Sequence, residues 1–549
     1  MHFFIFFLVT LLSGSQKYDL DKFKSAKRHS NDYRIWVYFE DKDPSIIKKI
    51  SDRAQKRRNK SAPNKRAYWY DLNVSKDYIE RLKKLGFLIL NQSRWLNAVT
   101  ISCDFDDFEL LKSLKFVKKI EPVHLMRKKK HFDTSTFNDQ NRSFLYGNSQ
   151  TQMEQINAVN AHNMGYFGQG VRVLYIDTGF NLEHEAFDSL QVISQYDFIN
   201  NDNETANETE EEFQNNQDEH GSLCLSVLSG FKEGQLIGPA FKSEFLLAKT
   251  EIVDQEIQQE EDNYVVALEW GEALGADIAC ASLGYVDWYS YEDLDGDTAP
   301  TTRAVDIASS LGVLCVNSAG NSGNDDWYYI ITPADADSVI SVGSVTSEGT
   351  LSSFSSHGPS YDGRIKPEVC AMGSSTFCIR PGTNSEYRYA SGTSLSAPLV
   401  GGAAAVILSA NYNWNAMEVR NAIMKTASMA EAPNNNYGYG ILNTVDAIQY
   451  NQQLRVENSA PIPILYEVKT FPNPFNPTIN IIISGAKEKL VNIEIFDITG
   501  KLIQGTYENK SLNDTFYFNW EPSIKSSGVY FIRTDIDNMI KHKKVSFLK

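Results

Sequence analysis

Short apolar runs alternate with helix-like segments from residue 170 onward, and this alternation limits the possible folds more than any other feature of the chain. The apolar runs occupy residues 171–176, 244–248, 277–283, 313–318 and 339–342. Short, continuous apolar runs are typical of parallel strands that are covered on both faces. Between them, residues 261–274 and 302–311 have helical spacing, and each is followed by glycine, which is favoured just beyond a helix end. The pattern predicts a doubly wound α/β domain, with a mostly parallel sheet and helices on both faces.

The segments on either side of this domain have different patterns. Residues 17–130 predict a small α+β domain. Its strands are expected at 33–38, 94–102 and 116–123, and its helices at 75–85 and 105–114. Residues 131–149 are polar and predict a linker to an α/β domain over 150–450. A proline-rich linker at 451–465 and a series of short alternating strands then predict a small β-sandwich over 466–549.

The first residues predict export from the cell. Residues 3–12 are apolar and precede a Ser-Gly-Ser tripeptide that suits a signal-peptidase site, so residues 1–15 are expected to be a signal peptide. This run is too short to be a membrane anchor, because crossing a bilayer takes about 20 residues. Residues 398–410 are also apolar and short, and we expect them to form a buried helix. The sequence therefore predicts no transmembrane segment.

Charge divides the chain into two parts. The formal net charge is −16, but residues 17–130 carry +14 and residues 131–549 carry −30. The acidic total argues against nucleic acid as a partner, because binding to phosphates requires a basic surface. The opposite signs would instead help the N-terminal domain to associate with the rest of the chain.

The cysteine pattern suggests neither a disulfide scaffold nor a zinc site. Six cysteines in 549 residues are too few for a disulfide framework, and no paired spacing with histidine is present. Cys280 and Cys315 lie within apolar runs and are expected to be buried thiols. Cys370 and Cys378 are close enough to close a small loop, and the sequence leaves open whether they form a disulfide.

Three side chains with acid, base and nucleophilic chemistry follow strand ends or helix starts. Asp177 ends the first strand, His220 opens an apolar helix-like run, and Ser394 opens another whose first turn is expected to contain Pro398. In a doubly wound sheet, strand carboxyl ends and helix amino ends share one edge, where ligands bind. We expect Ser394 to be a nucleophile, His220 its general base, and Asp177 the carboxylate that orients the imidazole. The amide of Asn321, which follows another buried strand, can stabilise an oxyanion there.

Other candidate residues have plainer explanations. His184 is expected to be structural and His357 a loop residue. Cys224, one helical turn after the candidate base, is expected to pack in the core, with a thiol-sensitive site as the alternative. The acidic segment 202–220 is expected to be a solvated insertion, with a calcium site as the alternative. Alternating carboxylates at 293–297 suit an oxygen-liking cation but lack the pattern of an EF-hand loop, so the sequence assigns no metal site.

The four catalytic segments resemble those of the subtilisin-like serine peptidases, or subtilases. The matching motifs are Asp-Thr-Gly from Asp177, His-Gly from His220, Ser-Ala-Gly-Asn ending at Asn321 and Gly-Thr-Ser-Leu-Ser-Ala-Pro around Ser394. The resemblance covers residues 150–450 and implies an endopeptidase that acts on proteins or peptides, needs no cofactor, and belongs to a family that often binds structural calcium. It implies that the segment Ser282, Leu283 and Gly284 pairs with the extended backbone of a substrate. It also implies that Ser318, Ala319 and Gly320 form a wall of the primary specificity pocket.

The sequence departs from the family pattern at positions that do not carry the catalytic atoms. The family usually has Thr-His after the His-Gly pair and Met-Ala after the nucleophile, where this chain has Ser222-Leu223 and Leu395-Ser396. The nearest alternative enzyme class is the α/β-hydrolases, but their nucleophile elbow needs glycine at the position of Ser396, and their catalytic residues follow a different order. A catalytically inactive surface binding protein on the same scaffold is the alternative from another class, and the intact catalytic set argues against it.

Both flanking domains extend the resemblance. Residues 17–130 resemble a subtilase propeptide in position and pattern, which implies an intramolecular chaperone and inhibitor. Residues 466–549 resemble the C-terminal sorting domain of the type IX secretion system, through motifs at 471–477, 496–500 and 527–530. Together they imply a zymogen that is exported through the periplasm of a Gram-negative bacterium and is then secreted or held at the cell surface.

Overall fold

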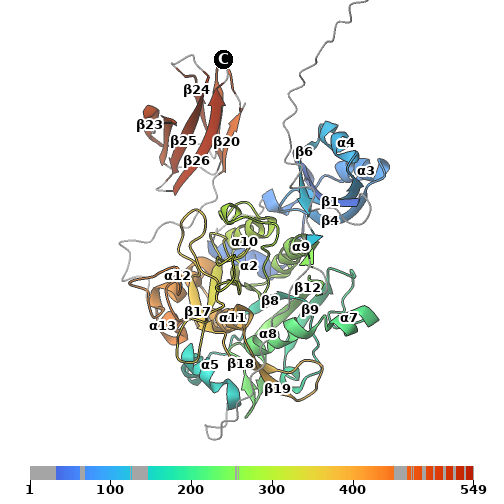
Figure 1. Ribbon diagram of the computed structural model, residues 1–549, viewed down its shortest axis with the longest axis vertical. Coiled ribbons are helices and arrows are strands. Elements are labelled where there is room, and N and C mark those ends of the chain that lie inside the picture. The colour runs from blue at the N-terminus through green and yellow to red at the C-terminus, as the bar shows by residue number, and fades with distance from the viewer. Residues whose placement is uncertain are drawn as a thin grey trace, which may run out of the picture. The chain divides into compact units, whose positions relative to one another are not determined.

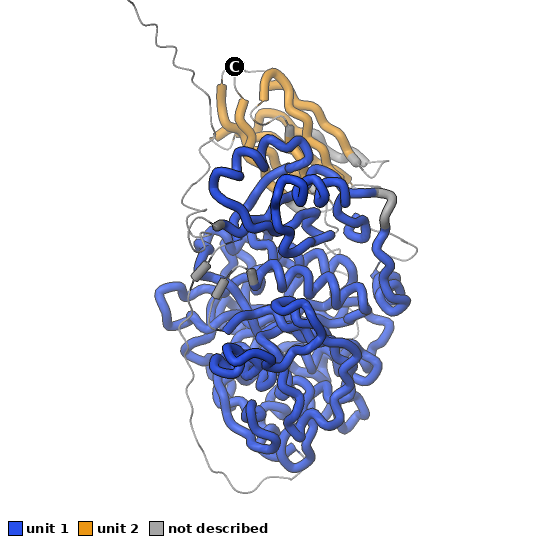
Figure 2. The backbone as a smooth tube through the Cα atoms, turned by 90° about the vertical axis from the view of Figure 1, so that its right-hand side faces the viewer, with its two compact units in different colours: residues 1–450 blue, residues 451–549 orange. Residues whose placement is uncertain are grey.

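The structure is a computed structural model, and it divides into two compact units, residues 1–450 and 451–549 (Figure 2). The described residues are 32–61, 69–123, 125–126, 146–253, 256–257, 259–450, 467–471, 473, 475–484, 490–498, 501–510, 515–522, 527–536 and 539–547. The predicted signal peptide at 1–15, most of the predicted linker at 131–149 and all of that at 451–465 lie outside the described residues.

A seven-stranded parallel sheet forms the centre of the first unit (Figure 1). In spatial order its strands are β17 (Val369–Met372), β16 (Ile340–Val345), β15 (Leu314–Ser318), β14 (Ile278–Ala281), β8 (Arg172–Asp177), β12 (Glu244–Lys249) and β9 (Gln191–Asp197). The chain adds β9 and β12 on one side of β8 and the later strands on the other, so the direction of growth reverses at β8. The predicted α/β fold is confirmed, although the edge strands β9 and β17 were not among the predicted strands.

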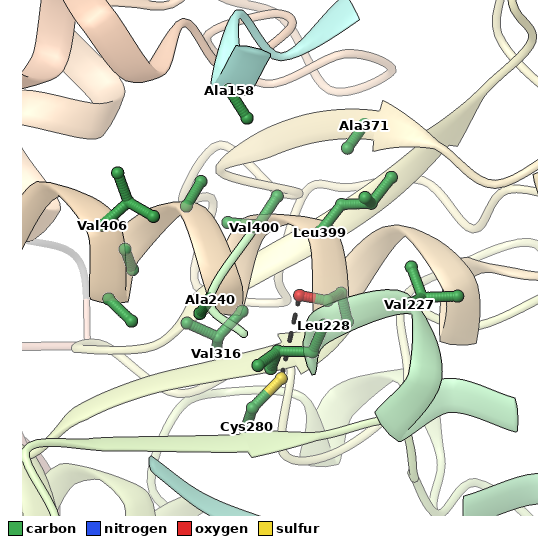
Figure 3. Close-up of a cluster of buried hydrophobic side chains, with 14 of the residues drawn as sticks. Ala158, Val227, Leu228, Ala240, Cys280, Val316, Ala371, Leu399, Val400 and Val406 are labelled. Carbon is green, nitrogen blue, oxygen red and sulfur yellow. Dashed lines mark hydrogen bonds between the residues drawn. The ribbon is translucent and has the colours of Figure 1, made fainter. Parts of the chain in front are cut away.

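Helices cover both faces of the sheet. On one face, α8 (Glu219–Ser229) and α11 (Thr393–Ala410) contribute to the largest cluster of buried apolar side chains. Figure 3 shows part of this cluster, including Leu228, Val316 and Val400. On the other face, α9 (Gln259–Leu274) and α10 (Pro300–Ser310) contribute to a second cluster. Both of these helices were predicted from their spacing.

Shorter elements complete this part of the first unit. They are α5 (Gln150–Gln155), α6 (Ala158–Asn163), α7 (Glu210–Asn215), α12 (Ala416–Thr426), α13 (Thr444–Ile448), η2 (Gly147–Ser149), η3 (Glu185–Phe187), η4 (Tyr291–Asp293), β10 (Phe231–Lys232), β11 (Leu236–Ile237), β13 (Glu256–Ile257), β18 (Thr376–Ile379) and β19 (Tyr387–Ala390). Helix α7 lies within the acidic segment 202–220, so part of that segment is a helix rather than a loop. Its side chains are at least partly exposed, and a capping box between Thr209 and Glu212 begins it.

A four-stranded antiparallel sheet forms the N-terminal α+β domain, which we call the prodomain. Its elements are β1 (Asp32–Phe39), β2 (Lys42–Ile47), α2 (Asp52–Ser61), η1 (Trp69–Asp71), β3 (Leu72–Val74), α3 (Lys76–Lys84), β4 (Leu88–Ser93), β5 (Ala98–Asp104), α4 (Asp107–Ser113), β6 (Val117–Val123) and β7 (Leu125–Met126). The prediction of one strand over 94–102 is wrong, because a turn with Asn97 at φ +53° separates β4 from β5. Helix α2 was not predicted.

The second unit consists of two antiparallel sheets. One contains β20 (Glu467–Phe471), β21 (Ile479–Ser484) and β24 (Thr515–Trp520), and the other contains β22 (Leu490–Asp497), β23 (Leu502–Lys510), β25 (Gly528–Ile536) and β26 (Met539–Phe547). Side chains from both sheets, among them Ile481, Ile493 and Ile532, share one buried cluster. The unit is therefore a β-sandwich, as the alternating strands predict.

One helix among the described residues, α11, is long and apolar enough to cross a membrane. However, 83% of its length is buried within the first unit, which identifies it as a core helix. This agrees with the prediction of a buried helix at 398–410. The cysteines also lie in the interior, and all six are buried free thiols. The Sγ atoms of Cys370 and Cys378 donate to the carbonyl oxygens of Tyr437 and Arg388, respectively, so the structure contains no disulfide between them.

Candidate active site

The parallel topology brings the predicted catalytic residues to one edge of the sheet. Asp177 is the last residue of β8, His220 lies in the first turn of α8, and Ser394 lies in the first turn of α11. Asn321 follows the carboxyl end of β15. The reversal of strand order at β8 places this group at the usual position of a ligand site in an open parallel sheet.

Asp177 and His220 form a direct hydrogen bond. The Nδ1 atom of His220 donates to Oδ1 of the fully buried Asp177 over 2.7 Å, and the backbone N–H of Thr178 donates to the same oxygen over 2.8 Å. Because a carboxylate only accepts, Nδ1 carries the proton in neutral His220 and Nε2 is left as the base. A Cβ atom on Gly221 would lie 3.0 Å from Cβ of Asp177, so glycine allows this close approach of α8 to β8.

Burial and the carboxylate act on His220 in opposite directions. Burial lowers the pKa of His220, but the negative charge and hydrogen bond of Asp177 outweigh it and raise this pKa well above its usual value. The imidazole side chain remains 24% exposed, so it can be reached from solvent. The site can therefore hold a proton on His220 after receiving it from a neighbouring hydroxyl.

Ser282 holds the start of α11 through two hydrogen bonds to Ser394. The Oγ–H of Ser394 donates to the Ser282 carbonyl over 3.2 Å, and the Oγ–H of Ser282 donates to the Ser394 carbonyl over 2.9 Å. Ser394 is thus not hydrogen-bonded to His220 in this conformer, a looser arrangement that is common in enzymes without substrate. Pro398 is the sixth residue of α11, not part of its first turn as predicted. It cannot supply the N–H that would bind the Ser394 carbonyl, and Ser282 supplies a donor instead.

Asn321 is tied to the same helix start. Its Oδ1 atom accepts from the N–H of Thr393 over 2.8 Å and from the hydroxyl of Thr393 over 3.0 Å. This fixes the amide so that its Nδ2 donor faces away from Thr393, and a Cβ atom on Gly392 would lie 3.6 Å from Nδ2. The amide donor therefore lies beside the turn that leads to Ser394.

Two segments of the predicted substrate site face each other across Ile331. Ser282, Leu283 and Gly284 follow β14, and Ser318, Ala319 and Gly320 lie at the end of β15. A Cβ atom on Gly284 would lie 2.5 Å from Cδ1 of Ile331, and one on Gly320 would lie 3.1 Å from Cγ1 of Ile331. The half-buried Ile331 side chain thus fills the space between the two glycines.

Cys224 lies directly beside the imidazole. Its Sγ atom is 3.8 Å from Nε2 of His220, and burial raises the pKa of Cys224, so the group is a protonated thiol at neutral pH. The side chain is completely buried in the main apolar cluster. Cys224 therefore packs in the core, as expected, and also lies next to the candidate base.

The other predicted histidines have structural contacts. His184 Nδ1 accepts from the N–H of Ala186, and its Nε2 is hydrogen-bonded to the carbonyl of Glu386. The ring of His357 stacks on Tyr328 in a loop. Neither histidine is part of the group formed by Asp177, His220 and Ser394.

Acidic groups near the catalytic segments have partners within the protein. Asp197, Asp202 and Glu208 could each direct an oxygen toward one cation. However, the buried ammonium of Lys249 lies 2.9 Å from Asp197 and provides a positive charge there. In the segment 293–297, the Asp295 carboxylate accepts from backbone N–H groups of its own turn. These contacts give Asp197 and Asp295 partners within the protein.

The prodomain contacts the α/β domain along α9 and β13. Its strand β7 pairs antiparallel with β13, with Leu125 opposite Ile257. The guanidinium of Arg34 donates to the buried Asp262 carboxylate over 2.5 Å, and the Ser93 hydroxyl donates to Glu269 over 2.6 Å. The prodomain therefore adds a short strand to the α/β domain and pairs with carboxylates of α9.

Sequence reasoning missed Ile331 and the arginines of α2. Nothing in the local sequence marks Ile331, because its position depends on three segments that are distant in the chain. Arg53, Arg57 and Arg58 do leave a signal, since a basic cluster spaced along one helix can pair with an acidic surface. That signal identifies a charged helix but not its partner.

Comparison with known protein families matches all three parts of the chain. A model described as the Subtilase family matches residues 168–440. A model of the peptidase S8 propeptide domain of Bacteroidota matches residues 34–138, and a model of the secretion system C-terminal sorting domain matches residues 469–547.

Several curated proteins are similar to this chain over half of its length or more. Subtilisin DY from Bacillus licheniformis is 30% identical over 296 residues, covering 54% of this chain and 96% of that protein. Subtilisin BL from Lederbergia lenta is 27% identical over 292 residues, covering 53% and 95%, respectively. Subtilisin E from Bacillus subtilis (strain 168) is 27% identical over 370 residues, covering 67% and 85%.

Proposed function

The chain belongs to the subtilase family of serine-type endopeptidases, and from this membership we propose that Asp177, His220 and Ser394 form its catalytic triad. The observation that carries the proposal is the 2.7 Å hydrogen bond between His220 and the buried Asp177, at the edge where Ser394 lies in the first turn of α11. A buried carboxylate that fixes one imidazole nitrogen leaves the other to act as a base.

Each residue has a defined step in peptide-bond hydrolysis. His220 Nε2 takes the Ser394 proton as Oγ attacks the substrate carbonyl carbon, and the imidazolium is stabilised by Asp177. The carbonyl oxygen becomes an oxyanion, which accepts hydrogen bonds from the Asn321 amide and the Ser394 N–H at the helix start. His220 then gives its proton to the leaving amine, and water hydrolyses the acyl-enzyme by the same steps in reverse.

The proposed substrates are extended polypeptides with a small side chain before the cleaved bond. Ser282, Leu283 and Gly284 are proposed to pair with the substrate backbone, and Ser318, Ala319 and Gly320 to wall the primary specificity pocket. Ile331 touches the glycine positions of both segments, so it leaves little depth for a large side chain. This restriction favours alanine, serine or glycine at that substrate position.

The flanking domains place the peptidase in a secretion pathway. The sorting domain and the Bacteroidota propeptide domain identify a secreted or cell-surface protein that is exported through type IX secretion. We propose that it is delivered by a signal peptide over residues 1–15, crosses the periplasm of a Gram-negative bacterium, and is kept latent by its own prodomain. We further propose domain limits of 17–130 for the prodomain, 150–450 for the peptidase and 466–549 for the sorting domain.

No cofactor takes part in the proposed mechanism. Because the triad supplies the nucleophile and base, and the Asn321 amide and the Ser394 N–H supply the oxyanion donors, a calcium ion would serve only to stabilise the fold. An inactive surface binding protein is the alternative, and it is not favoured, because the complete catalytic set belongs to a chain of this enzyme family.

Covalent labelling tests the proposal. A fluorophosphonate probe should label the matured protein at Ser394, and Ser394→Ala should abolish both labelling and hydrolysis of a protein substrate. Asn321→Ala should keep the labelling site but lower kcat by roughly 100- to 1000-fold, the cost of losing one oxyanion donor. Labelling at another serine, or full hydrolysis by Ser394→Ala, would exclude the proposed triad.

A further inference from the structure

An arm of the prodomain continues the contact that the prodomain sheet makes with α9 toward the C-terminal end of that helix. This arm, residues 51–61, consists of helix α2 and the preceding Ser51. Figure 1 shows α2 beside α9 and α10, and its contacts with α9 agree with this placement. The N–H of Ser51 donates to the Ala273 carbonyl over 2.9 Å, so the arm meets α9 at its C-terminal end.

Arg57 is inserted between the C-terminal ends of two helices. Its guanidinium donates to the carbonyl of Leu311 over 3.2 Å, that of Glu272 over 3.3 Å and that of Ala276 over 2.5 Å. The last carbonyls of a helix have no partner within the helix, and its negative end favours a cation. Arg57 thus satisfies carbonyls at the ends of both α9 and α10, while its own side chain is buried.

Two glycines make room for these arginines. Gly275 and Gly312 follow α9 and α10 with φ +91° each, a conformation that glycine adopts without strain. A Cβ atom on Gly275 would lie 2.8 Å from Cβ of Arg53, and one on Gly312 would lie 3.4 Å from Cγ of Arg57. The helix ends therefore have a shape that accepts the arm.

A carboxylate at the centre of this contact binds two guanidinium groups. Glu272 forms ion pairs with Arg57 and with Arg58, whose Nη2 lies 2.8 Å from Oε2, and the Glu272 side chain is completely buried. Arg58 also pairs with Asp71 of the prodomain over 2.8 Å. A third arginine, Arg53, pairs with Asp277 and donates to the carbonyl of Gly170. The surface of the α/β domain here is built to receive guanidinium groups.

This contact lies at the opposite edge of the sheet from the candidate triad. Strand β8 begins at Arg172, near the carbonyl of Gly170 that Arg53 binds, and ends at Asp177. At about 3.3 Å per residue, these strand ends are about 17 Å apart. Asp277 likewise precedes β14, whereas Ser282 follows it. Cleavage of the chain at the active site would leave the arm contact intact.

We propose that the ends of α9 and α10, with Glu272 between them, form a guanidinium-binding site that keeps the cleaved prodomain on the peptidase. The inference rests on the proposed triad and on the further premise that this triad cleaves the chain after its own prodomain. The prodomain sheet already contacts α9, and the arm adds a second contact. Two contacts made by one fragment raise the effective concentration of the prodomain at the active site after the peptide bond is cut. Release then breaks several buried, charge-assisted hydrogen bonds together, and contacts of this kind mainly set the dissociation rate. The arm thereby sets how long the matured enzyme stays latent.

The experiment follows the full chain through its own maturation. The precursor is allowed to cleave itself, and the fragments are then separated by size exclusion under native conditions and by denaturing electrophoresis. In the unmodified protein, the cleaved prodomain should co-elute with the peptidase. In Arg57→Ala and in Glu272→Gln, the fragment should dissociate at least tenfold faster, and hydrolysis of an added peptide should begin correspondingly earlier. Arg81→Ala, which removes an exposed arginine of the prodomain, should match the unmodified protein.

The two proposals fail in different ways. If no cleaved prodomain forms in the unmodified chain but forms when active peptidase is added, the proposed self-maturation is wrong. If cleaved prodomain forms and stays bound equally long in Arg57→Ala and Glu272→Gln, the proposed anchor is wrong. Should these variants fail to fold, hydrogen exchange on the unmodified, cleaved protein decides. Amides of residues 53–61 should remain as protected as those of β1, and rapid exchange of the arm alone would overturn the proposal.

Discussion

The hydroxyl of Ser282 donates a hydrogen bond to the carbonyl oxygen of Ser394 over 2.9 Å, in the place of the backbone N–H that Pro398 lacks. The Tyr175 hydroxyl lies 3.1 Å from the same Ser282 oxygen and can donate to it. A chain of hydrogen bonds therefore runs from β8 through the residue after β14 to the start of α11. Ser282 is thus a positioning residue for the proposed nucleophile as well as part of the predicted substrate segment.

Ser282→Ala should slow catalysis without changing the backbone that pairs with substrate. The Ser394 carbonyl would lose its donor, and an unsatisfied buried acceptor costs about 1–3 kcal/mol. We expect kcat to fall roughly tenfold, the rate of fluorophosphonate labelling to fall in parallel, and KM to change little. Ser409→Ala, which removes a hydroxyl bound within α11 itself, is the control and should leave kcat unchanged. A Ser282→Ala enzyme with normal kcat would show that α11 does not need this donor.

The pH dependence of activity should report the His220–Asp177 pair. Neutral His220 is the base, so activity is lost as the pH falls through the pKa of His220, and that pKa is raised by Asp177 well above its usual value. The acid limb of kcat/KM should accordingly lie above pH 6.5. Asp177→Asn removes the charge that opposes burial, so the limb should move to lower pH, and kcat should fall by about 10⁴-fold because the tautomer is no longer fixed. An unmoved limb in Asp177→Asn would assign the titration to another group.

Mercuric ion should inactivate the enzyme through Cys224. The Sγ atom of Cys224 lies 3.8 Å from Nε2 of His220, so a metal bound to this sulfur would block the base. Cys224→Ala should keep most of the activity, because Cys224 contributes packing, and should resist mercuric ion at concentrations that inactivate the unmodified enzyme. Cys315→Ala is the matched control, since it removes a buried thiol from the other face of the sheet and should remain sensitive. Equal sensitivity of Cys224→Ala would point to a different thiol.

Most elements in which buried apolar residues recur at a regular spacing were predicted from the sequence. Helices α9 and α10 have apolar spacing and end before glycines that adopt positive φ. The central strands are continuous apolar runs, because both of their faces are covered. The edge strand β9 alternates between exposed and partly buried residues and includes polar side chains, so its composition resembles that of a loop.

Helix α2 was not predicted because its buried face is not apolar. Of its buried residues, Ala54 is apolar, whereas Arg57 and Arg58 are charged. Their burial is compensated by Glu272, more than 200 residues later in the chain, and no local pattern can indicate such a partner. The same limit applies to the site: local motifs place Asp177, His220 and Ser394 at one edge, whereas the contact of Ile331 with two glycines emerges only from the folded chain.

Ile331→Gly should widen the range of substrates. The Ile331 side chain lies within contact distance of a Cβ atom placed on Gly284 or on Gly320, so its removal opens space between the predicted substrate-pairing segment and the predicted wall of the primary pocket. A pocket of this kind discriminates by about 1–3 kcal/mol for each methylene that fits or clashes. In a matched peptide series, kcat/KM for phenylalanine or leucine before the cleaved bond should rise at least tenfold, whereas kcat/KM for alanine should stay equal or fall. Ile193→Gly, an exposed change on β9, should leave the preference as it was. If Ile331→Gly still prefers alanine by the original ratio, the depth of the pocket is set by other residues.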